Sequence, residues 1–420
     1  MRLSEFIEYE ANERAERRRL AEEKSYEILD RLEGVGDRFA DVANDGGFGS
    51  VSPSIFVGRS GYPEVSTGLL SPVGNETDAA RFATSGEWYA EGVSIGDVFE
   101  RRTSLLNASQ STPVETNVHD AWDGFLGVQR EVAIADRPVG VEVGLNGGPE
   151  LDLGLSPGDV STPTGPRAPA REATLTENPH VPRPVQKTLE DDDWAATGAM
   201  NYLYNRGFDV YEINTILSAG ALGQRDNRRL VPTRWSITAV DDTVGQFLRG
   251  KRQDAPSVDT VQVFHNEYLG NSFWVILAPG NWEFELVEFK APGSVWNPDP
   301  EAGIWLASDY EGNSGRTSYV EQTAGAYYAA RLAVLEHLDA IGRQAKVLVL
   351  RHVSDDYWGP VGVWQVREAI RHAFDGERGE SESFDAAVRE IADRLPVSLA
   401  KLRRQSTLAA GRQSGLDSFI

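Results

Sequence analysis

The sequence predicts an α+β protein: an antiparallel sheet with packed helices, a charged N-terminal helix and a flexible C-terminal tail. Residues 260–289 alternate polar and apolar side chains and contain the turn signals Gly270-Asn271 and Pro279-Gly280-Asn281. Residues 319–341 repeat apolar side chains at helical spacing and stop at Gly342. Both ends of the chain carry fewer apolar residues than these two segments. We therefore expect the packed core to lie between the two ends.

The chain is expected to divide into four parts. They are a charged helix over residues 1–33, a mixed α/β body over 34–289, a helix-rich part over 290–396 and a flexible tail over 397–420. Within the body, residues 151–184 are dominated by Pro, Gly, Ser and Thr. We therefore expect a long loop or insertion there, without a packed element.

The N-terminal helix is predicted from a thin apolar stripe of Leu20, Ile28 and Leu32 at helical spacing. Glu and Arg are interleaved along it, which suits ion pairs within a helix. Arginines 17–19 allow a role in binding a partner or DNA. A solvated helix lying on the body is the simpler interpretation.

A first binding candidate follows a short extended segment predicted at residues 54–58. Glycines surround the next turn and allow the close approach of a ligand. Arg59 suits a phosphate, and Tyr62 suits a base or another ring. A purely structural hairpin explains the same pattern equally well.

Further along, residues 128–145 alternate enough to predict two strands joined near Arg137. Residues 194–219 predict helices that are interrupted near Gly207. These elements are expected to complete the mixed body.

A second binding candidate lies in residues 229–248, where Arg234 stands beside a β-prone run that follows Pro232. Arg234 is expected to enter a strand at the rim of a sheet. We expect it to share one site with Arg59 and Tyr62, in which the arginines bind phosphate and the tyrosine stacks on a base. Internal salt bridges are the competing interpretation of both arginines.

Two acidic or titratable pairs are weaker candidates. Asp241 is adjacent to Asp242, and neighbouring residues of a strand point to opposite faces, which disfavours a paired-acid catalytic site. His265 and Glu267 share one strand face and are candidates for proton transfer. A structural His–Glu pair is the commoner case.

Helices dominate the expected part at residues 290–396. Apolar spacing predicts them at 319–341, from Trp364 to about Phe374, and from Phe384 to Leu395, where Pro396 stops the last one. Residues 347–350 form a short buried strand in this interpretation. Beyond Lys401 the chain has little to bury, which predicts a flexible leader.

The last eight residues carry a spaced set of anchors: Gln413, Leu416, Phe419 and Ile420. One 3₁₀ turn places residues three apart on one edge, so that Leu416 and Phe419 would project together into a partner's groove. The pattern resembles the PIP box, by which replication and repair proteins dock on the sliding clamp PCNA. Ile420 departs from it, since an aromatic residue is usual there, which implies weaker docking. A frayed tail without a partner is the alternative.

The charge of the chain is strongly acidic, with 64 Asp and Glu against 41 Lys and Arg and a formal net charge of −23. Only 6 of those 41 are Lys, which leaves 35 Arg. A diffuse acidic surface poor in Lys indicates a salt-adapted protein of a halophile. It does not exclude DNA as a partner, because counterion release contributes little in concentrated salt.

Composition excludes several classes of chemistry. The chain has no Cys, which excludes disulfides, thiol catalysis and Cys-ligated zinc. No apolar run is long enough for a membrane span, and residues 1–20 lack an apolar signal region, so a cytoplasmic location is expected. No P-loop or nuclease metal motif is present, and we assign no catalytic residue, metal or cofactor.

Two internal blocks and the tail together resemble the archaeal Nre family. The blocks are Phe56-Val57-Gly58-Arg59-Ser60-Gly61-Tyr62-Pro63-Glu64-Val65 and Arg234-Trp235-Ser236-Ile237-Thr238, and the likeness extends from about Ala21 to Ile420. The resemblance implies a role in DNA repair and binding to PCNA through the tail. Some members carry an N-terminal Cys-rich segment expected to bind zinc, which this chain lacks.

Three functions remain open at this level. The first is a clamp-recruited repair factor whose body engages damaged DNA. The second is a repair enzyme, either a nuclease or a nucleotide-dependent one, with a pocket near Arg59, Tyr62, Arg234 and Asp241, to which His265 would belong. The third is an adaptor without enzymatic activity. The first is favoured.

Stability is expected to rise with added KCl well beyond physiological ionic strength. Salt screens the repulsion among acidic surface groups, which otherwise destabilises the compact state. Thermal unfolding measured from dilute to molar KCl tests this. A melting temperature that stays constant over that range would contradict the halophilic interpretation.

Overall fold

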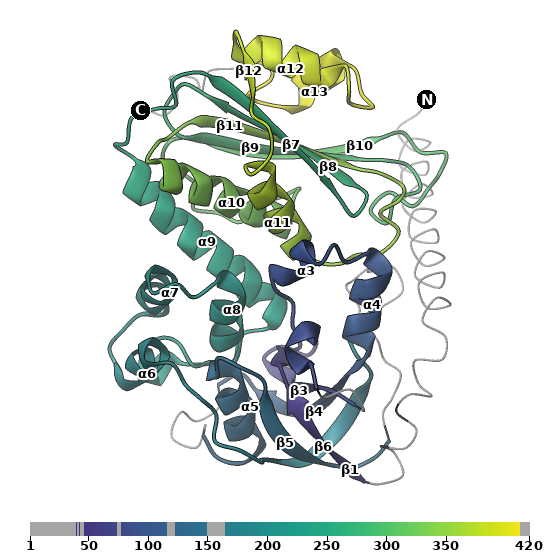
Figure 1. Ribbon diagram of the computed structural model, residues 1–420, viewed down its shortest axis with the longest axis vertical. Coiled ribbons are helices and arrows are strands. Elements are labelled where there is room, and N and C mark those ends of the chain that lie inside the picture. The colour runs from purple at the N-terminus through teal and green to yellow at the C-terminus, as the bar shows by residue number, and fades with distance from the viewer. Residues whose placement is uncertain are drawn as a thin grey trace, which may run out of the picture. The chain divides into compact units, whose positions relative to one another are not determined.

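The computed structural model describes residues 39, 42, 46–73, 77–115, 122–148 and 164–411 (Figure 1). The chain divides into two compact units, and each contains a six-stranded sheet. We call residues 30–155 and 162–244 the N-terminal unit, and residues 245–420 with 1–29 and 156–161 the C-terminal unit. The predicted α+β class is confirmed. The predicted helix at 1–33 and the anchors at 413–420 lie outside the described residues.

The sheet of the N-terminal unit has the strand order β1-β5-β6-β4-β3-β2. All neighbouring strands are antiparallel except β4 and β6, which are parallel. Its core contains Val57, Leu69, Leu106 and Val141, all almost completely buried. The strands are β1 (Gly47–Ser52), β2 (Ser54–Val57), β3 (Glu64–Pro72), β4 (Leu105–Pro113), β5 (Val139–Leu145) and β6 (Arg167–Leu175).

The helices of this unit include α4, α5 and α8, which contact its sheet, and α9, which continues from residue 245 into the C-terminal unit. Two begin with a capping box, in which a side chain at each end of the first turn binds the other's backbone amide: Ser94 with Asp97, and Asp209 with Glu212. The helices predicted on either side of Gly207 are confirmed. The elements are η2 (Ala79–Phe82), α3 (Glu87–Ala90), α4 (Ile95–Thr103), α5 (Gly124–Ile134), α6 (Arg183–Glu190), α7 (Ala196–Asn205), α8 (Val210–Ser218), η3 (Arg225–Asn227) and α9 (Thr233–Arg252).

Two predictions for this unit are wrong. The first strand expected within residues 128–145 is the second half of α5, where Phe125, Gln129 and Val132 are buried at helical spacing. The supposed loop at 151–184 contains β6, which pairs with both β4 and β5. The buried positions of β6 are filled by Ala, which has a low strand propensity, so the sequence pattern did not predict a strand here.

The sheet of the C-terminal unit has the order β10-β9-β11-β8-β7-β12, and only β9 and β11 are parallel. The antiparallel sheet predicted around 260–289 is confirmed by β7 and β8, whose hairpin turns at Gly270. However, β11 lies between β8 and β9. The strands are β7 (Val261–Tyr268), β8 (Asn271–Ala278), β9 (Glu283–Lys290), β10 (Trp305–Glu311), β11 (Lys346–Val353) and β12 (Gly379–Ser381).

Helices cover both faces of this second sheet (Figure 1). One face carries α10 (Gly325–Ile341) and α11 (Trp364–Ala373), and the other carries α12 (Phe384–Ala392) and α13 (Leu399–Gln405). The predicted C-terminal ends of α10 and α11 agree with the structure, but α10 begins at Gly325 and not at residue 319 as predicted. Gly342 closes α10 in the left-handed conformation expected of a C-terminal glycine.

The structure of residues 397–411 differs from the prediction, which placed them in a flexible tail. Ser398 caps α13, and Leu402, Leu408 and Ala409 are buried against strand residues such as Phe289. The prediction failed here because these few apolar residues are separated by polar ones and form only one short helix. They nevertheless complete the core on this face of the sheet.

A buried carboxylate anchors the same segment. Glu285 of β9 is 1 % exposed. It accepts hydrogen bonds at 2.8 Å from the Ser406 hydroxyl and from the backbone amides of Thr407 and Leu408. Burial raises the pKa of Glu285, and these hydrogen bonds oppose that rise. The carboxylate is tolerated in the core because the C-terminal turn supplies its donors.

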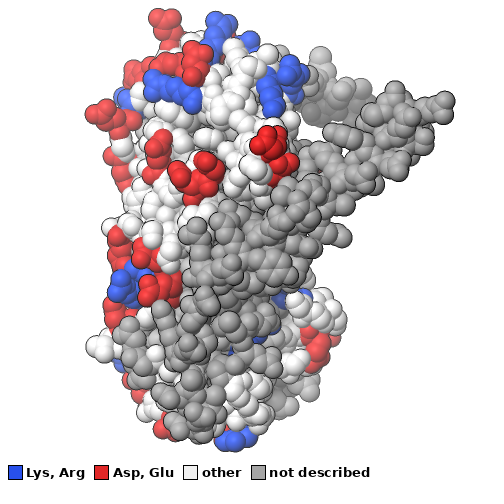
Figure 2. Space-filling view, turned by 90° about the vertical axis from the view of Figure 1, so that its right-hand side faces the viewer, with Lys and Arg blue, Asp and Glu red and all other residues white. Residues whose placement is uncertain are grey.

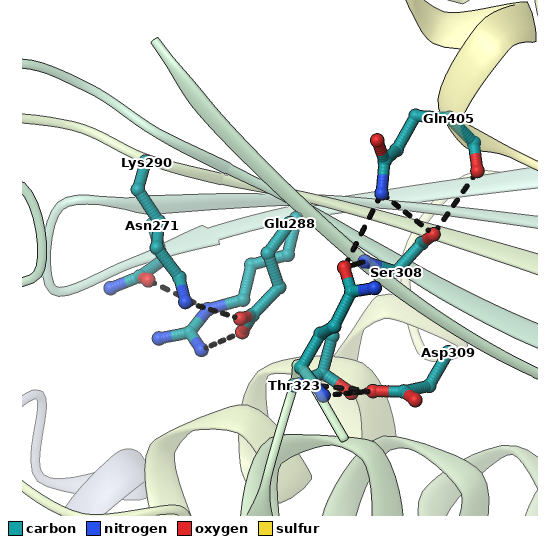
Figure 3. A network of polar contacts seen from close by, with 9 residues as sticks. Asn271, Glu288, Lys290, Ser308, Asp309, Thr323 and Gln405 are labelled. Carbon is teal, nitrogen blue, oxygen red and sulfur yellow. Dashed lines mark hydrogen bonds and ion pairs between the residues drawn. The ribbon is translucent and has the colours of Figure 1, made fainter. Parts of the chain in front are cut away.

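Polar contacts also tie α13 and the loop before α10 to the edge strand β10 (Figure 3). Gln405 Nε2 donates to Ser308 Oγ, which in turn donates to the Gln405 carbonyl, each at 3.1 Å. Asp309 accepts from the Thr323 hydroxyl and amide at 2.8 Å. Burial acts to raise the pKa of Asp309, but the Thr323 and backbone hydrogen bonds hold it below the ordinary value.

Replacing Glu285 with Ala is expected to destabilise the protein by about 3 kcal/mol or more. The change leaves three donors without an acceptor, and a buried unsatisfied group costs about 1–3 kcal/mol. Chemical denaturation measures the difference. Glu267→Ala is the control, since that side chain is 72 % exposed and a surface change is usually worth less than about 0.5 kcal/mol. Equal stability of the two variants would contradict the anchoring role.

Candidate nucleic-acid interface

The first part of the candidate site is the turn that joins β2 to β3. The Gly58 amide donates to the Ser66 carbonyl at 2.7 Å, and the Glu64 amide donates to Gly61 at 3.0 Å. Gly61 has a φ of +83°, and a Cβ there would lie 2.8 Å from the Glu64 carbonyl oxygen, so the position requires glycine. The Tyr62–Pro63 peptide bond is cis. The turn is therefore a hairpin, and Arg59 and Tyr62 are exposed on it.

The second part is the first turn of α9. Thr233 Oγ1 accepts a hydrogen bond from the Val57 amide at 2.9 Å and lies 3.1 Å from Ser218 Oγ. Ser236 Oγ donates to Asn214 Oδ1 at 2.5 Å. These bonds fix the start of α9 against the end of β2 and against α8. The next residues after Thr233, Arg234 and Trp235, are exposed.

An aromatic pair joins the two parts. The ring centroids of Tyr62 and Trp235 are 5.1 Å apart, with an angle of 56° between the ring planes. Tyr62 is 48 % exposed and Trp235 is 45 % exposed. Large rings that remain half exposed while touching each other offer an apolar face to a ligand. Trp235 belongs to the site, although we did not predict it from the sequence.

Two arginines are close to the aromatic pair in the sequence. Arg59 lies three residues before Tyr62, and Arg234 lies directly before Trp235. Nearby, Arg229 makes an exposed ion pair with Glu115 at 3.5 Å. Guanidinium groups beside aromatic rings combine a phosphate-binding cation with a stacking surface. We call Arg59, Tyr62, Arg234 and Trp235 the aromatic–arginine surface.

The local structure of Arg234 differs from the prediction. It lies in a helix, because Ser236, Val240, Val244 and Leu248 are buried at a spacing of four residues. The β-branched residues of this stretch favoured a strand by propensity, but burial of one helical face decided the outcome. The start of α9 nevertheless lies beside the β2–β3 turn, so that Trp235 of the second block contacts Tyr62 of the first.

Two predicted residues lie elsewhere. Asp241 is in α9, but it is buried, so its carboxylate is not part of the exposed surface. His265 is in β7 of the other unit, stacked on Trp274 with a centroid distance of 3.9 Å and 28° between the planes. Its Nε2 lies 3.0 Å from Ser272 Oγ and 3.6 Å from a Glu267 carboxylate oxygen. Burial lowers the pKa of His265, and Glu267 opposes this.

The residues that the structure describes contain no group of three or more His, Cys, Asp or Glu side chains arranged to hold a metal ion. None of their helices is both long and apolar enough to cross a membrane.

Family models match most of the chain. The model for the archaeal Nre N-terminal region matches residues 20–297, and that for the archaeal Nre C-terminal region matches residues 311–419. The N-terminal match extends from the first sheet through β9 of the second. The chain belongs to the archaeal Nre family.

Three relatives named as DNA repair proteins resemble the chain over most of its length. The DNA repair protein NreA of Haloferax volcanii is 70 % identical over 420 residues and is covered completely, as is this chain. The DNA repair proteins NreA and NreB of Archaeoglobus fulgidus are 38 % and 35 % identical, over 85 % and 89 % of this chain and 88 % and 91 % of their own lengths. No solved structure matches the fold.

Proposed function

We propose that this protein acts in DNA repair, docks on the sliding clamp PCNA through Gln413, Leu416, Phe419 and Ile420, and engages damaged DNA through the aromatic–arginine surface. Membership of the Nre family and the naming of its relatives as DNA repair proteins support the repair role. The spaced anchors of the tail support docking on a clamp. The exposed contact between Tyr62 and Trp235 carries the proposal for DNA.

The geometry of the surface suits an unpaired base. A base inside a duplex already has both faces covered by its neighbours, whereas a base displaced at a lesion or in a single strand has a free face. Stacking on a protein ring then contributes about 1–3 kcal/mol per base and depends little on sequence. The tilt of 56° between the rings of Tyr62 and Trp235 prevents both from lying flat on one base. The pair therefore offers one stacking face and one edge.

The flanking arginines complete the interaction. Arg59 and Arg234 are exposed on two elements that meet at the ring pair. A strand that stacks a base on the rings brings its phosphates beside these residues. Arginine binds phosphate oxygens through two parallel N–H groups, which adds orientation to the attraction. Because the protein has a net charge of −23, nucleic acid is repelled by most of its surface and would be attracted to the aromatic–arginine surface.

Tyr62→Ala and Trp235→Ala are each expected to weaken binding of single-stranded DNA by about tenfold, because each removes a stacking ring worth about 1–3 kcal/mol. Fluorescence anisotropy with a labelled oligonucleotide measures the affinity. Tyr319→Ala and Trp305→Ala are matched controls, since those side chains are 58 % and 49 % exposed in the other unit. If the control variants lose as much affinity as the site variants, the surface is misassigned.

Arg59→Ala and Arg234→Ala are expected to lower DNA affinity and to reduce its salt dependence, while PCNA binding stays unchanged. Each variant removes a cation that would displace a counterion from the strand, so the slope of log affinity against log salt falls by about 0.7 per phosphate contact. Anisotropy in a KCl series measures this slope. Loss of folding in both variants would instead favour an internal salt-bridge role.

Deletion of residues 413–420 is expected to abolish PCNA binding without changing thermal unfolding, since the described core ends before them. Phe419→Ala is expected to weaken binding by about 2 kcal/mol, as truncation of a buried aromatic anchor commonly does. Ser418→Ala, a change between the anchors, is the control. Calorimetric titration of PCNA gives the affinities, and full affinity after the deletion would refute docking through the tail.

A further inference from the structure

The segment that precedes the tail is held rigidly on the second sheet. We define the C-terminal block as residues 384–411, which contain α12, α13 and the turn that follows. Leu402, Leu408 and Ala409 are buried in the core, and Glu285 accepts three hydrogen bonds from residues 406–408. Gln405 forms hydrogen bonds with Ser308 of β10 (Figure 3). The position at which the chain leaves this unit is therefore fixed.

The distance from this exit to the anchors is short. Gln413 follows the last described residue, Gly411, by two positions, and Leu416 follows it by five. A chain extends at most about 3.6 Å per residue, which limits these separations to about 7 Å and about 18 Å. A protein that holds Gln413 and Leu416 must therefore lie next to the C-terminal block.

The block differs in charge from the rest of the chain. It contains five Lys and Arg against three Asp and Glu, while the whole chain has a net charge of −23. Asp385 pairs with both Arg389 and Arg403, and Glu390 pairs with Arg394 at 3.5 Å. Arg404 is exposed and makes no ion pair with any of the residues that the structure describes. Blue and red side chains gather at the upper end of the face in Figure 2, where Figure 1 has α12 and α13.

We propose that the C-terminal block is a second contact surface for the protein that accepts the tail, and that Arg404 meets acidic residues beside that protein's groove. This inference rests on the proposed docking on PCNA and adds to it that the body, not the tail alone, touches the clamp. The fixed exit and the short connection supply the geometry, and the local positive charge supplies the complementarity.

The consequence for binding is a gain in affinity over the tail alone. When a second contact is attached rigidly to the first, it forms as an intramolecular event at high effective concentration. A long flexible connection would lower that concentration and uncouple the two contacts. The charge contact is also sensitive to ionic strength, so the full chain should lose affinity with KCl more steeply than an isolated tail does.

Calorimetric titration of PCNA tests the proposal with four probes. They are the full chain, Arg404→Glu, a variant with about eight Gly and Ser residues inserted between Gly411 and Arg412, and a synthetic peptide of residues 412–420. Arg404→Glu is expected to weaken binding about tenfold, and the peptide and the linker variant should also bind about tenfold more weakly than the full chain. Combined with the inserted linker, Arg404→Glu should have little further effect.

Lys251→Glu is the control for the change of charge, because Lys251 is an exposed cation at the end of α9 in the same unit, where it pairs with Asp339. Thermal unfolding checks that each variant folds. Equal affinities of the peptide and the full chain, or an unchanged affinity of Arg404→Glu, would overturn the second contact while docking of the tail stands. Absence of binding by both the peptide and the full chain would overturn the docking itself and this inference with it.

Discussion

Burial of the Glu285 carboxylate is the constraint on which the C-terminal unit depends. A carboxylate in an apolar core is tolerated only when its oxygens are satisfied. The donors come from residues 406–408, more than a hundred positions along the chain. The sheet can therefore bury this face only when the end of the described chain lies upon it. That requirement places α13 and the turn after it on the sheet, and α12 packs on the same face through its own apolar residues.

The same unit pairs its other internal charges. Arg351 donates to Glu288 at 2.6 Å, and Lys290 lies 3.1 Å from the same carboxylate (Figure 3). Burial alone would raise the pKa of Glu288, but these cations hold it below its ordinary value. Arg331 and Glu311 form a second buried pair at 3.0 Å. Such pairs are little affected by salt. The expected dependence of stability on KCl therefore rests on the acidic surface and not on these buried pairs.

Periodic segments could be predicted from the sequence, and segments defined by long-range contacts could not. β7, β8 and α10 carry regular patterns of burial, which the sequence displays directly. β6 is built on alanines and depends on partners distant in sequence. In the candidate site, Arg59, Tyr62 and Arg234 were identified by their chemistry. Trp235 was missed as a site residue because its exposure depends on α9 being a helix. The β-branched residues near it favoured a strand in the sequence analysis.

The order of synthesis along the chain determines when the C-terminal block can cover the second sheet. Residues 399–411 are made after every other residue that the structure describes. Until they emerge from the ribosome, the strand face that contains Val287, Phe289 and Leu348 lacks the cover of α13 and the turn after it, and an exposed apolar surface attracts other unfinished chains. A chain interrupted before this point would expose that face and would lack the anchors as well. Interruption before this point therefore removes the cover of the sheet and the proposed anchors together.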